Sequence, residues 1–191
     1  MLKGIFALAV FTLFSSCSTA QVTRSVSPPP MRWDHREEAA VWTEAALKAM
    51  QDQGLALGQS MPSDVTKWCP GYPEASQSER DAFWVGLLSA LAKHESTWNP
   101  KAVGGGGRWF GLVQIAPATA RGYGCTARSG EALKDGTANL SCAIRILSTT
   151  VPRDGVVAAG GGGIAADWGP FVSASKRADM AGWTKEQPYC Q

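Results

Sequence analysis

The middle of the chain carries apolar residues at spacings of three and four, the pattern of a helix with one buried face. The positions that form this stripe are Trp84, Leu88 and Leu91. Glu95 lies four residues further along the same stripe, so the pattern places one carboxylate at the end of a buried face. Ser76 or Ser78 can cap the beginning of this helix, and Asn99-Pro100 is expected to end it.

A second helix is predicted from Asp34 to about Ala56. The residues expected near its buried side are Ala40, Val41, Ala45, Leu47 and Met50. Acidic side chains, Asp34, Glu37 and Glu38, would lie in its first turn, where they suit the positive end of the helix dipole. We therefore expect this helix to pack on the core.

The rest of the chain also favours helices. Pro117 suits the first turn of a short helix that the following glycines would end. Another amphipathic helix is predicted over Thr137–Val151, and a short one around Ser173–Met180. Residues 58–73 and 160–163 are expected to be loops. Because no alternating run of five residues indicates a strand, the expected fold class is mainly α.

The chain begins with the pattern of an export signal. Lys3 precedes an apolar run, Gly4–Phe14, that is too short to span a bilayer. Residues 14–17, FSSC, resemble a lipoprotein box, whereas Ser-Thr-Ala at 18–20 resembles a cleavage site. We expect lipidation of Cys17, and cleavage after residue 20 is the alternative.

These signals predict the organisation of the chain. Residues 1–20 would be a signal peptide, residues 21–33 a Pro/Ser-rich tether, and residues 34–191 a single domain. The expected location is the periplasm, with attachment to a membrane through the lipid on Cys17. Without Lys3 the chain keeps 17 basic residues against 16 acidic ones, a formal charge of +1, and this balance does not indicate a nucleic-acid partner.

Four cysteines remain when Cys17 is set aside, and an even number in an exported chain indicates disulfides. We expect Cys125 to pair with Cys142 and Cys69 with Cys190, although three pairings are possible. A zinc site is the alternative. Structural disulfides are favoured, and no metal is expected, because the cysteines are separated by 55, 16 and 47 residues and form no C-x-x-C pair.

Ordered sequence blocks follow the central stripe. They are Glu95-Ser96, then GLVQI at 111–115 and PATA at 117–120. This combination resembles the soluble lytic transglycosylase (SLT) domain of bacterial cell-wall enzymes, whose pattern is E-S, a loop, G-L-M-Q and P-x-T-A. The resemblance covers about 30 residues closely and, more loosely, residues 76–169.

The resemblance implies a lysozyme-like fold of the goose-type or SLT class and cleavage of the β-1,4 bond between N-acetylmuramic acid and N-acetylglucosamine in peptidoglycan. In this family one glutamate performs both proton transfers. Protonated Glu95 would give its proton to the leaving oxygen, and its carboxylate would then take the proton of the C6 hydroxyl, which closes a 1,6-anhydro ring. The reaction requires no cofactor, and the expected partner of the protein, a monomer, is the glycan strand.

Burial gives a physical reason for this role of Glu95. A glutamate has a pKa near 4.3 in water, and removal from water would raise that pKa by about two units because it disfavours the charged form. A carboxyl group with such a pKa can donate a proton near neutral pH.

Several residues near Glu95 are candidates for substrate contact. Gln114 matches the family glutamine that hydrogen-bonds sugar or orients the glutamate, and its alternative role is to bond only loop backbone. Ser96 would donate to backbone or to Glu95. Trp98 and Trp109, which flank the glycine-rich loop 104–107, would stack on sugar rings. The remaining candidates are Gly111, Tyr123, Asp167 and Trp168.

One block departs from the family pattern. Where the family has A-Y-N-A-G, residues 165–169 read AADWG, so Ala166 replaces the tyrosine that faces the glutamate. Either Tyr123 or Tyr189 supplies that contact, or the protein does without it. Asp167 would be a structural residue or a base that activates water, which would make the enzyme an inverting muramidase. A non-catalytic peptidoglycan-binding lipoprotein that kept the fold is the other alternative.

Overall fold

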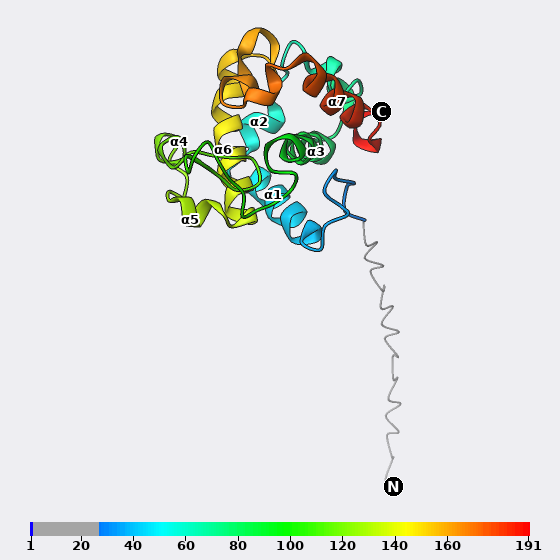
Figure 1. The fold of residues 1–191 in the computed structure, drawn as a ribbon. Coiled ribbons are helices and arrows are strands. Elements are labelled where there is room, and N and C mark those ends of the chain that lie inside the picture. The colour runs from blue at the N-terminus through cyan, green and yellow to red at the C-terminus, as the bar shows by residue number, and fades with distance from the viewer. Residues whose placement is uncertain (2–26) are drawn as a thin grey trace.

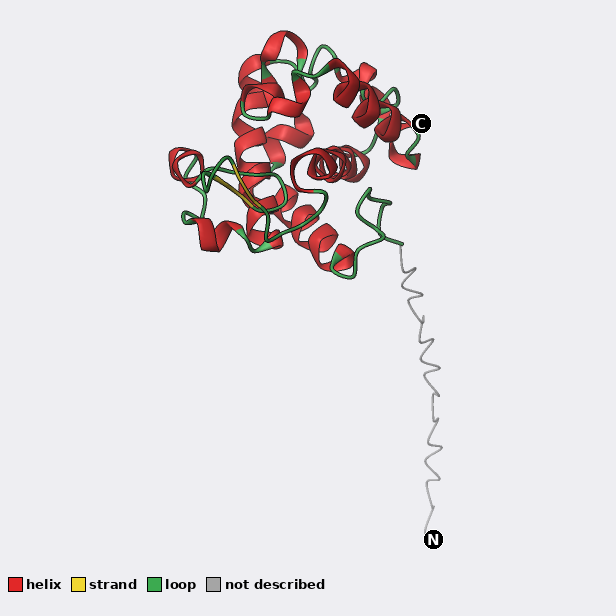
Figure 2. Cartoon of the chain, in the orientation of Figure 1, coloured by secondary structure: helices red, strands yellow, loops and turns green. Residues whose placement is uncertain are grey.

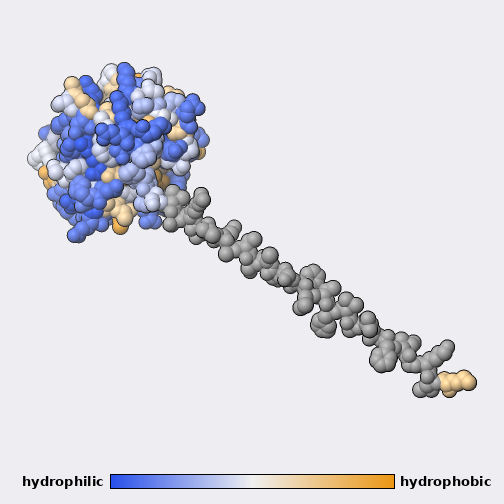
Figure 3. Space-filling view, turned by 90° about the vertical axis from the view of Figure 1, so that its right-hand side faces the viewer, coloured by the Kyte–Doolittle hydropathy of each residue, from blue (hydrophilic) through white to orange (hydrophobic). Residues whose placement is uncertain are grey.

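The computed structural model describes Met1 and residues 27–191. The expected signal peptide, Cys17 and the first part of the tether therefore lie outside the described residues. Within residues 27–191, no helix is both long enough and apolar enough to cross a membrane. Figure 3 shows one face of the domain, which is mostly hydrophilic with scattered apolar residues.

Helices make up most of the described chain, as the sequence predicted (Figure 2). The α-helices are α1 (Ala39–Gln53), α2 (Leu55–Gln59), α3 (Gln77–Ser96), α4 (Pro117–Gly122), α5 (Gly130–Leu133), α6 (Gly136–Asp154) and α7 (Ala174–Lys185). The short 3-10 turns are η1 (Val65–Lys67), η2 (Tyr72–Glu74), η3 (Ala159–Gly161), η4 (Gly163–Ala166), η5 (Gly169–Phe171) and η6 (Pro188–Cys190). Two short strands, β1 (Val103–Gly104) and β2 (Trp109–Phe110), pair antiparallel with Val103 opposite Phe110.

The helices pack around α3, which Figure 1 shows nearly along its axis. Helices α1 and α2 contact both α3 and α6, and α7 packs against α3. In Figure 1, α4 and α5 lie to the left of α6, whereas α7 and the C-terminus lie on the far side of α3. The short strands lie in the loop region beside α4 and α5 (Figure 2).

Helix α3 is buried on every side over most of its length. Each residue from Ala82 to Ala92 is buried, including Ser89, so the expected single apolar stripe understates the burial. Ser76 begins the helix with a capping box, in which its hydroxyl accepts from the backbone N–H of Glu79 and the Glu79 carboxylate accepts from the backbone N–H of Ser76. The helix ends at Ser96, before the expected stop at Asn99-Pro100, because Thr97 already has a left-handed φ of 52°.

Helix α1 differs from its prediction in its start and in its buried face. It begins at Ala39, its first turn holds no acidic residue, and the residues from 32 to 38 form turns. The buried residues are Ala39, Trp42, Thr43, Ala46, Ala49 and Met50, whereas Val41 is 58% exposed. The face is set by Trp42, whose ring packs edge-on against Trp33 with centroids 5.9 Å apart, because burial of large aromatic surface outweighs burial of alanine and valine.

The expected boundary between tether and domain is also wrong. Met31 and Trp33 are 3% and 0% exposed, so the chain enters the core before residue 34. The Trp33 ring N–H donates to Thr43 Oγ1 at 2.9 Å, and the guanidinium of Arg32 forms two hydrogen bonds with the Asp179 carboxylate, at 2.7 and 2.9 Å. The segment around Trp33 is therefore a structural part of the domain.

The remaining elements agree with the sequence in type and differ in length. Pro117 begins α4 as predicted, α6 extends the prediction of 137–151 through Pro152 to Asp154, and α7 continues to Lys185. The expected loops at 58–73 and 160–163 contain short helical turns, and α5 had no sequence signal. Both expected disulfides are present, Cys69–Cys190 and Cys125–Cys142. The first joins η6 to the segment between η1 and η2, and the second joins the segment after α4 to α6.

Candidate active site

Glu95 is the penultimate residue of α3 and its side chain is half-buried. Burial raises the pKa of this carboxyl from 4.5 to about 7, and the positive charge of Lys176 on α7 opposes the rise. No hydrogen bond within the described chain contributes to this shift. Glu95 is therefore a carboxyl group that holds its proton near neutral pH because its surroundings solvate the charged form poorly.

The residues on either side of Glu95 fix the end of α3. Ser96 Oγ donates to the carbonyl of Leu112 at 2.7 Å, so it bonds the GLVQI block rather than the Glu95 carboxylate. On the other side, Lys93 Nζ and His94 Nε2 both contact the Asp179 carboxylate, at 3.0 and 2.7 Å. Arg32 and these two residues lower the pKa of Asp179 far below its usual range, and Asp179 thus holds the end of α3 against α7.

The GLVQI block is a tight turn in which glycine is required at position 111. Gly111 has a φ of 83°, and a Cβ there would collide with the carbonyl of Leu133 and the amide of Asn139. Phe110 and Ile115 exchange two backbone hydrogen bonds, at 3.0 and 3.1 Å, that close the turn. Gln114 also has a positive φ, 50°, which is uncommon for a residue other than glycine and places strain in this turn.

Asn139 on α6 holds the same turn, and sequence reasoning missed it. It is fully buried, and its amide uses three hydrogen bonds of 3.0 Å. Its Nδ2 donates to the carbonyls of Phe110 and Leu133, and its Oδ1 accepts from the backbone N–H of Val113. An asparagine inside the predicted amphipathic helix 137–151 was the available signal, because buried polar side chains are rare without full hydrogen bonding.

Gln114 takes the structural role that the sequence left open. Its Nε2 donates to the carbonyl of Gly111 at 2.9 Å and to that of Ala102 at 3.2 Å. These two acceptors fix the orientation of the amide and leave Oε1 next to the Cα of Gly104. Gln114 therefore joins the GLVQI turn to the glycine-rich loop, and only its oxygen is left for an additional partner.

The three tryptophans proposed to contact sugar differ in availability. Trp109 is 43% exposed, and the Arg108 guanidinium lies 4.9 Å from its ring centroid. Trp98 folds back along α3, where its ring N–H donates to the carbonyl of Ser89 at 2.9 Å and His35 packs edge-on against it. Trp168 is 3% exposed and donates to the carbonyl of Val113 at 2.7 Å, so it packs in the interior. Trp109 is the best placed of the three for stacking on a sugar.

Tyr123 and Tyr189 were both considered as sources of the contact that the family tyrosine makes at the position of Ala166, and the structure places them differently. Tyr189 is 5% exposed, lies against Gly86 in the middle of α3, and donates to the carbonyl of Pro30. That position is more than two helical turns before Glu95, so Tyr189 does not supply the missing contact. Tyr123 donates its hydroxyl proton to Asp167 Oδ2 at 3.1 Å. Partial burial raises the pKa of Asp167, and burial together with Asp167 raises the pKa of Tyr123.

A small pocket of about 40 Å³ brings together several predicted site residues. Its lining includes Trp109, Gln114, Asp167 and Trp168, which come from two separate stretches of the sequence, 109–114 and 167–168, and Glu95 is not among the lining residues. Among the described residues, no group of three His, Cys, Asp or Glu side chains is placed to hold a metal ion. The structure thus presents a half-buried glutamate with a raised pKa at the end of α3, and the next residue, Ser96, bonds the turn whose Gln114 lines this pocket; such a carboxyl group suits acid–base chemistry.

Comparisons with known proteins agree with this architecture. The family model described as the transglycosylase SLT domain matches residues 73–159. Two solved structures described as glutamate-to-glutamine mutants of Bd0314 DslA match with a TM-score of 0.77 each. The first is 27% identical and the match covers 85% of this chain and 98% of that chain. The second is 26% identical and the match covers 87% of this chain and 100% of that chain. The structure described as wild-type form 2 matches with a TM-score of 0.71 at 25% identity, covering 85% of this chain and 97% of its own. Comparison with curated proteins finds no match.

Residues 73–159 are therefore similar to the transglycosylase SLT domain, and the chain has a mainly helical, lysozyme-like fold. Glu95, the GLVQI block and the PATA block all lie within the matched residues. The domain indicates a lytic transglycosylase-like enzyme whose substrate is peptidoglycan.

Replacing Asn139 with alanine is expected to lower the free energy of unfolding by about 2–4 kcal/mol, because a buried N–H and two carbonyls lose their partner. Chemical denaturation measures the change. Thr149→Ala on the same helix is the control, since Thr149 is exposed and bonds only the carbonyl of Arg145 within its own helix. Equal losses in the two variants would contradict the role of Asn139.

Glu95→Gln is expected to stabilise the protein at pH 8 and to have little effect at pH 4. The Glu95 pKa is near 4.5 in the unfolded chain and about 7 in the folded protein. Between these values the unfolded chain has lost a proton that the folded protein keeps, so stability falls as the pH rises. Above pH 7 the penalty is roughly 1–3 kcal/mol, allowing for partial exposure.

Thermal unfolding at the two pH values checks this expectation. Glu186→Gln serves as the control because Glu186 is exposed on the surface after α7, where charge removal should not change the pH dependence. A Glu95→Gln variant that is no more stable than the parent at pH 8 would show that Glu95 is not desolvated.

Proposed function

We propose that the protein is an exported lytic transglycosylase that cleaves the β-1,4 bond between N-acetylmuramic acid and N-acetylglucosamine and forms 1,6-anhydro-N-acetylmuramic acid. Glu95 is the general acid and then the general base. The observation that carries this proposal is the position of Glu95, half-buried at the end of a helix that is fully buried from Ala82 to Ala92, with a pKa of about 7. The SLT domain supplies the substrate class.

The raised pKa of Glu95 suits both halves of the reaction. Near neutral pH the protonated form is well populated and can protonate the oxygen of the leaving sugar. The carboxylate left behind is a stronger base than an ordinary glutamate and can remove the proton of the muramoyl C6 hydroxyl, whose oxygen then bonds to C1. Glu95 gives one proton to the leaving oxygen as the bond from C1 to that oxygen breaks, and it takes another from the C6 hydroxyl as the C6 oxygen bonds to C1, so one carboxyl group completes the cycle.

The polymer is proposed to lie across the GLVQI turn and the glycine-rich loop. Trp109 is the exposed aromatic face at this loop, and Gln114 Oε1 is the free acceptor. The lack of a side chain at Gly104 lets the glycine-rich loop pass close to Gln114, since a Cβ there would collide with Gln114 Oε1. Two side chains hold the backbone of this surface in place. Trp168 donates to the carbonyl of Val113, and Ser96 donates to the carbonyl of Leu112.

A muramidase that hydrolyses the same bond is the second candidate, and Asp167 favours it. This carboxylate lines the pocket that holds Trp109 and Gln114, accepts a hydrogen bond from Tyr123, and has a pKa raised by partial burial. In that mechanism Asp167 would take a proton from water while Glu95 protonates the leaving oxygen, and inversion at the sugar carbon would result.

Mass spectrometry of digested peptidoglycan separates the two mechanisms. The transglycosylase yields 1,6-anhydro muramoyl ends, and Glu95→Gln is expected to lower the rate by at least about 100-fold because it removes the only proposed acid and base. Asp167→Asn should leave the product type unchanged and lower the rate less than tenfold. Glu186→Gln is the folded control with parental activity.

Reducing muramoyl ends, together with loss of activity in Asp167→Asn, would instead assign the muramidase reaction. An unchanged rate in Glu95→Gln would leave a peptidoglycan-binding protein without catalysis.

We also propose that Cys17 carries a lipid and anchors the protein on the periplasmic side of a membrane. The proposal rests on the FSSC sequence at the end of the apolar run. A labelled fatty-acid precursor should be incorporated into the protein and lost in Cys17→Ser. Mature protein that begins at Gln21 would show cleavage after Ala20 and exclude the anchor.

A further inference from the structure

The segment 31–35, whose first part the sequence placed in the tether, is fixed against α3. Trp33 anchors this segment in the core, where its ring N–H donates to Thr43 Oγ1. The backbone N–H of Arg32 donates to Ser89 Oγ on α3 at 2.9 Å, and Ser89 is fully buried. The side chains that this segment carries therefore have fixed positions beside α3.

Trp98 reaches the same serine from the other end of α3. Its ring N–H donates to the carbonyl of Ser89 at 2.9 Å, nine residues back along the chain. His35 packs edge-on against the Trp98 ring, with centroids 4.5 Å apart. The four residues Arg32, His35, Ser89 and Trp98 thus form a closed circuit of contacts, which we call the clamp.

The clamp encloses a strained turn that follows Glu95. Thr97 and Trp98 have φ values of 52° and 56°, a conformation that is unfavourable for residues with a side chain. The backbone N–H groups of both residues bond the carbonyl of Ala92. Glu95 lies between Ala92 and Thr97, so it is inside the turn that these bonds close. Two successive residues in this conformation need tertiary contacts to hold them, and the clamp supplies such contacts.

Charged side chains surround the same end of α3. Lys93 and His94, which directly precede Glu95, contact the Asp179 carboxylate at 3.0 and 2.7 Å. Arg32 of the clamp contacts this carboxylate at 2.7 Å. The segment that carries the clamp is therefore also joined to the last turn of α3 through an ionic cluster.

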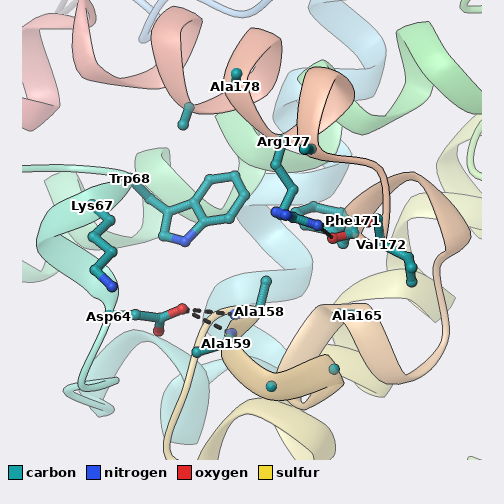
Figure 4. A pocket seen from close by; sticks show the side chains of 14 residues that line it. Asp64, Lys67, Trp68, Ala158, Ala159, Ala165, Phe171, Val172, Arg177 and Ala178 are labelled. Carbon is teal, nitrogen blue, oxygen red and sulfur yellow. Dashed lines mark hydrogen bonds between the residues drawn. The ribbon is translucent and has the colours of Figure 1, made fainter.

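Lys176 on α7 is a further charge that acts on Glu95. Arg177, the next residue, holds the beginning of α7, because its guanidinium donates to the carbonyls of Phe171 and Val172 at 2.7 Å. Figure 4 shows the Arg177 side chain extended toward Phe171. A substitution in the uncharged part of the clamp leaves these bonds in place, so it can test the clamp without removing a charge.

We propose that Trp98 is a positioning residue for the reaction, which holds the turn after Glu95 through its bond to Ser89 and its contact with His35. The proposal rests on the proposed function, which makes Glu95 the acid and the base. Proton transfer requires the carboxyl group to lie within hydrogen-bond reach of the sugar oxygens, so a small displacement of the last turn of α3 lowers the rate. Trp98 thus acts through Glu95 and does not stack on the sugar.

Steady-state kinetics of Trp98→Phe on peptidoglycan test the assignment. The substitution keeps an aromatic ring beside His35 and removes the N–H that bonds Ser89. We expect kcat to fall about tenfold and KM to stay within about twofold of the parent. Trp183→Phe is the matched control with parental kcat and KM, since Trp183 is a half-buried tryptophan that lies against Gly86, nine residues before Glu95.

The pH dependence of kcat gives a readout that a merely structural role of Trp98 would not move. In the parent the rate should fall as the pH rises through about 7, because Glu95 then loses the proton that it donates. A looser turn admits water to this carboxyl group. Burial affects the Glu95 pKa more than Lys176 does, so hydration lowers that pKa. In Trp98→Phe the decline should begin about half a pH unit to one unit lower.

His35→Ala tests the clamp at an exposed position, where the substitution should not prevent folding. We expect kcat to fall about two- to threefold with KM unchanged, because the Trp98 ring loses one of its contacts. This variant decides the proposal if Trp98→Phe does not fold, and parental kcat in His35→Ala would then overturn it.

A raised KM with parental kcat in Trp98→Phe would assign Trp98 to sugar binding and overturn the proposal. Parental kcat and pH dependence, or an equal loss in Trp183→Phe, would also overturn it. If the parent does not cleave peptidoglycan, the proposed function fails, and NMR titration of the Glu95 carboxyl in protein labelled with 13C-glutamate decides the clamp separately. A lower Glu95 pKa in Trp98→Phe than in the parent would support the clamp, and equal pKa values would overturn it.

Discussion

The complete burial of the middle of α3 is the constraint on which the rest of the structure depends. A helix enclosed from Ala82 to Ala92 has no freedom to shift or rotate without opening the core. The last turn of α3 therefore has a fixed position. Glu95 lies in this turn, where the core meets the surface. The same lack of water that stabilises the helix raises the pKa of Glu95. The core and the proposed chemistry have one physical origin.

The surface proposed to meet the polymer is built mainly from loop backbone, and side chains from distant segments hold it. Asn139 and Ser96 bond the GLVQI turn, and Trp168 does so through the carbonyl of Val113. Each bond satisfies a backbone group that would otherwise be unpaired away from water. This arrangement lets a turn with positive φ at Gly111 and Gln114 persist next to the end of α3, which carries the proposed acid Glu95.

The predictions from sequence succeeded where one local signal decided the outcome. The order of Glu95, GLVQI and PATA indicated the domain, and the cysteine count indicated two disulfides. Pro117 predicted the start of α4, and Ser76, one of two serines considered as caps, begins α3. They failed where several apolar residues competed for the interior. In α1 the pattern pointed to Val41, but Trp42 is buried because its ring packs against Trp33, which had been placed in the tether.

The sequence by itself determined the class of protein, the helical fold and the identity of the proposed acid, because motif order and helical periodicity are properties of neighbouring residues. Only the tertiary structure decided that Tyr123 rather than Tyr189 lies beside Asp167, that Gln114 bonds the loop, and that His35 packs against Trp98. These facts depend on contacts between segments tens of residues apart, and no local pattern specifies which segments meet.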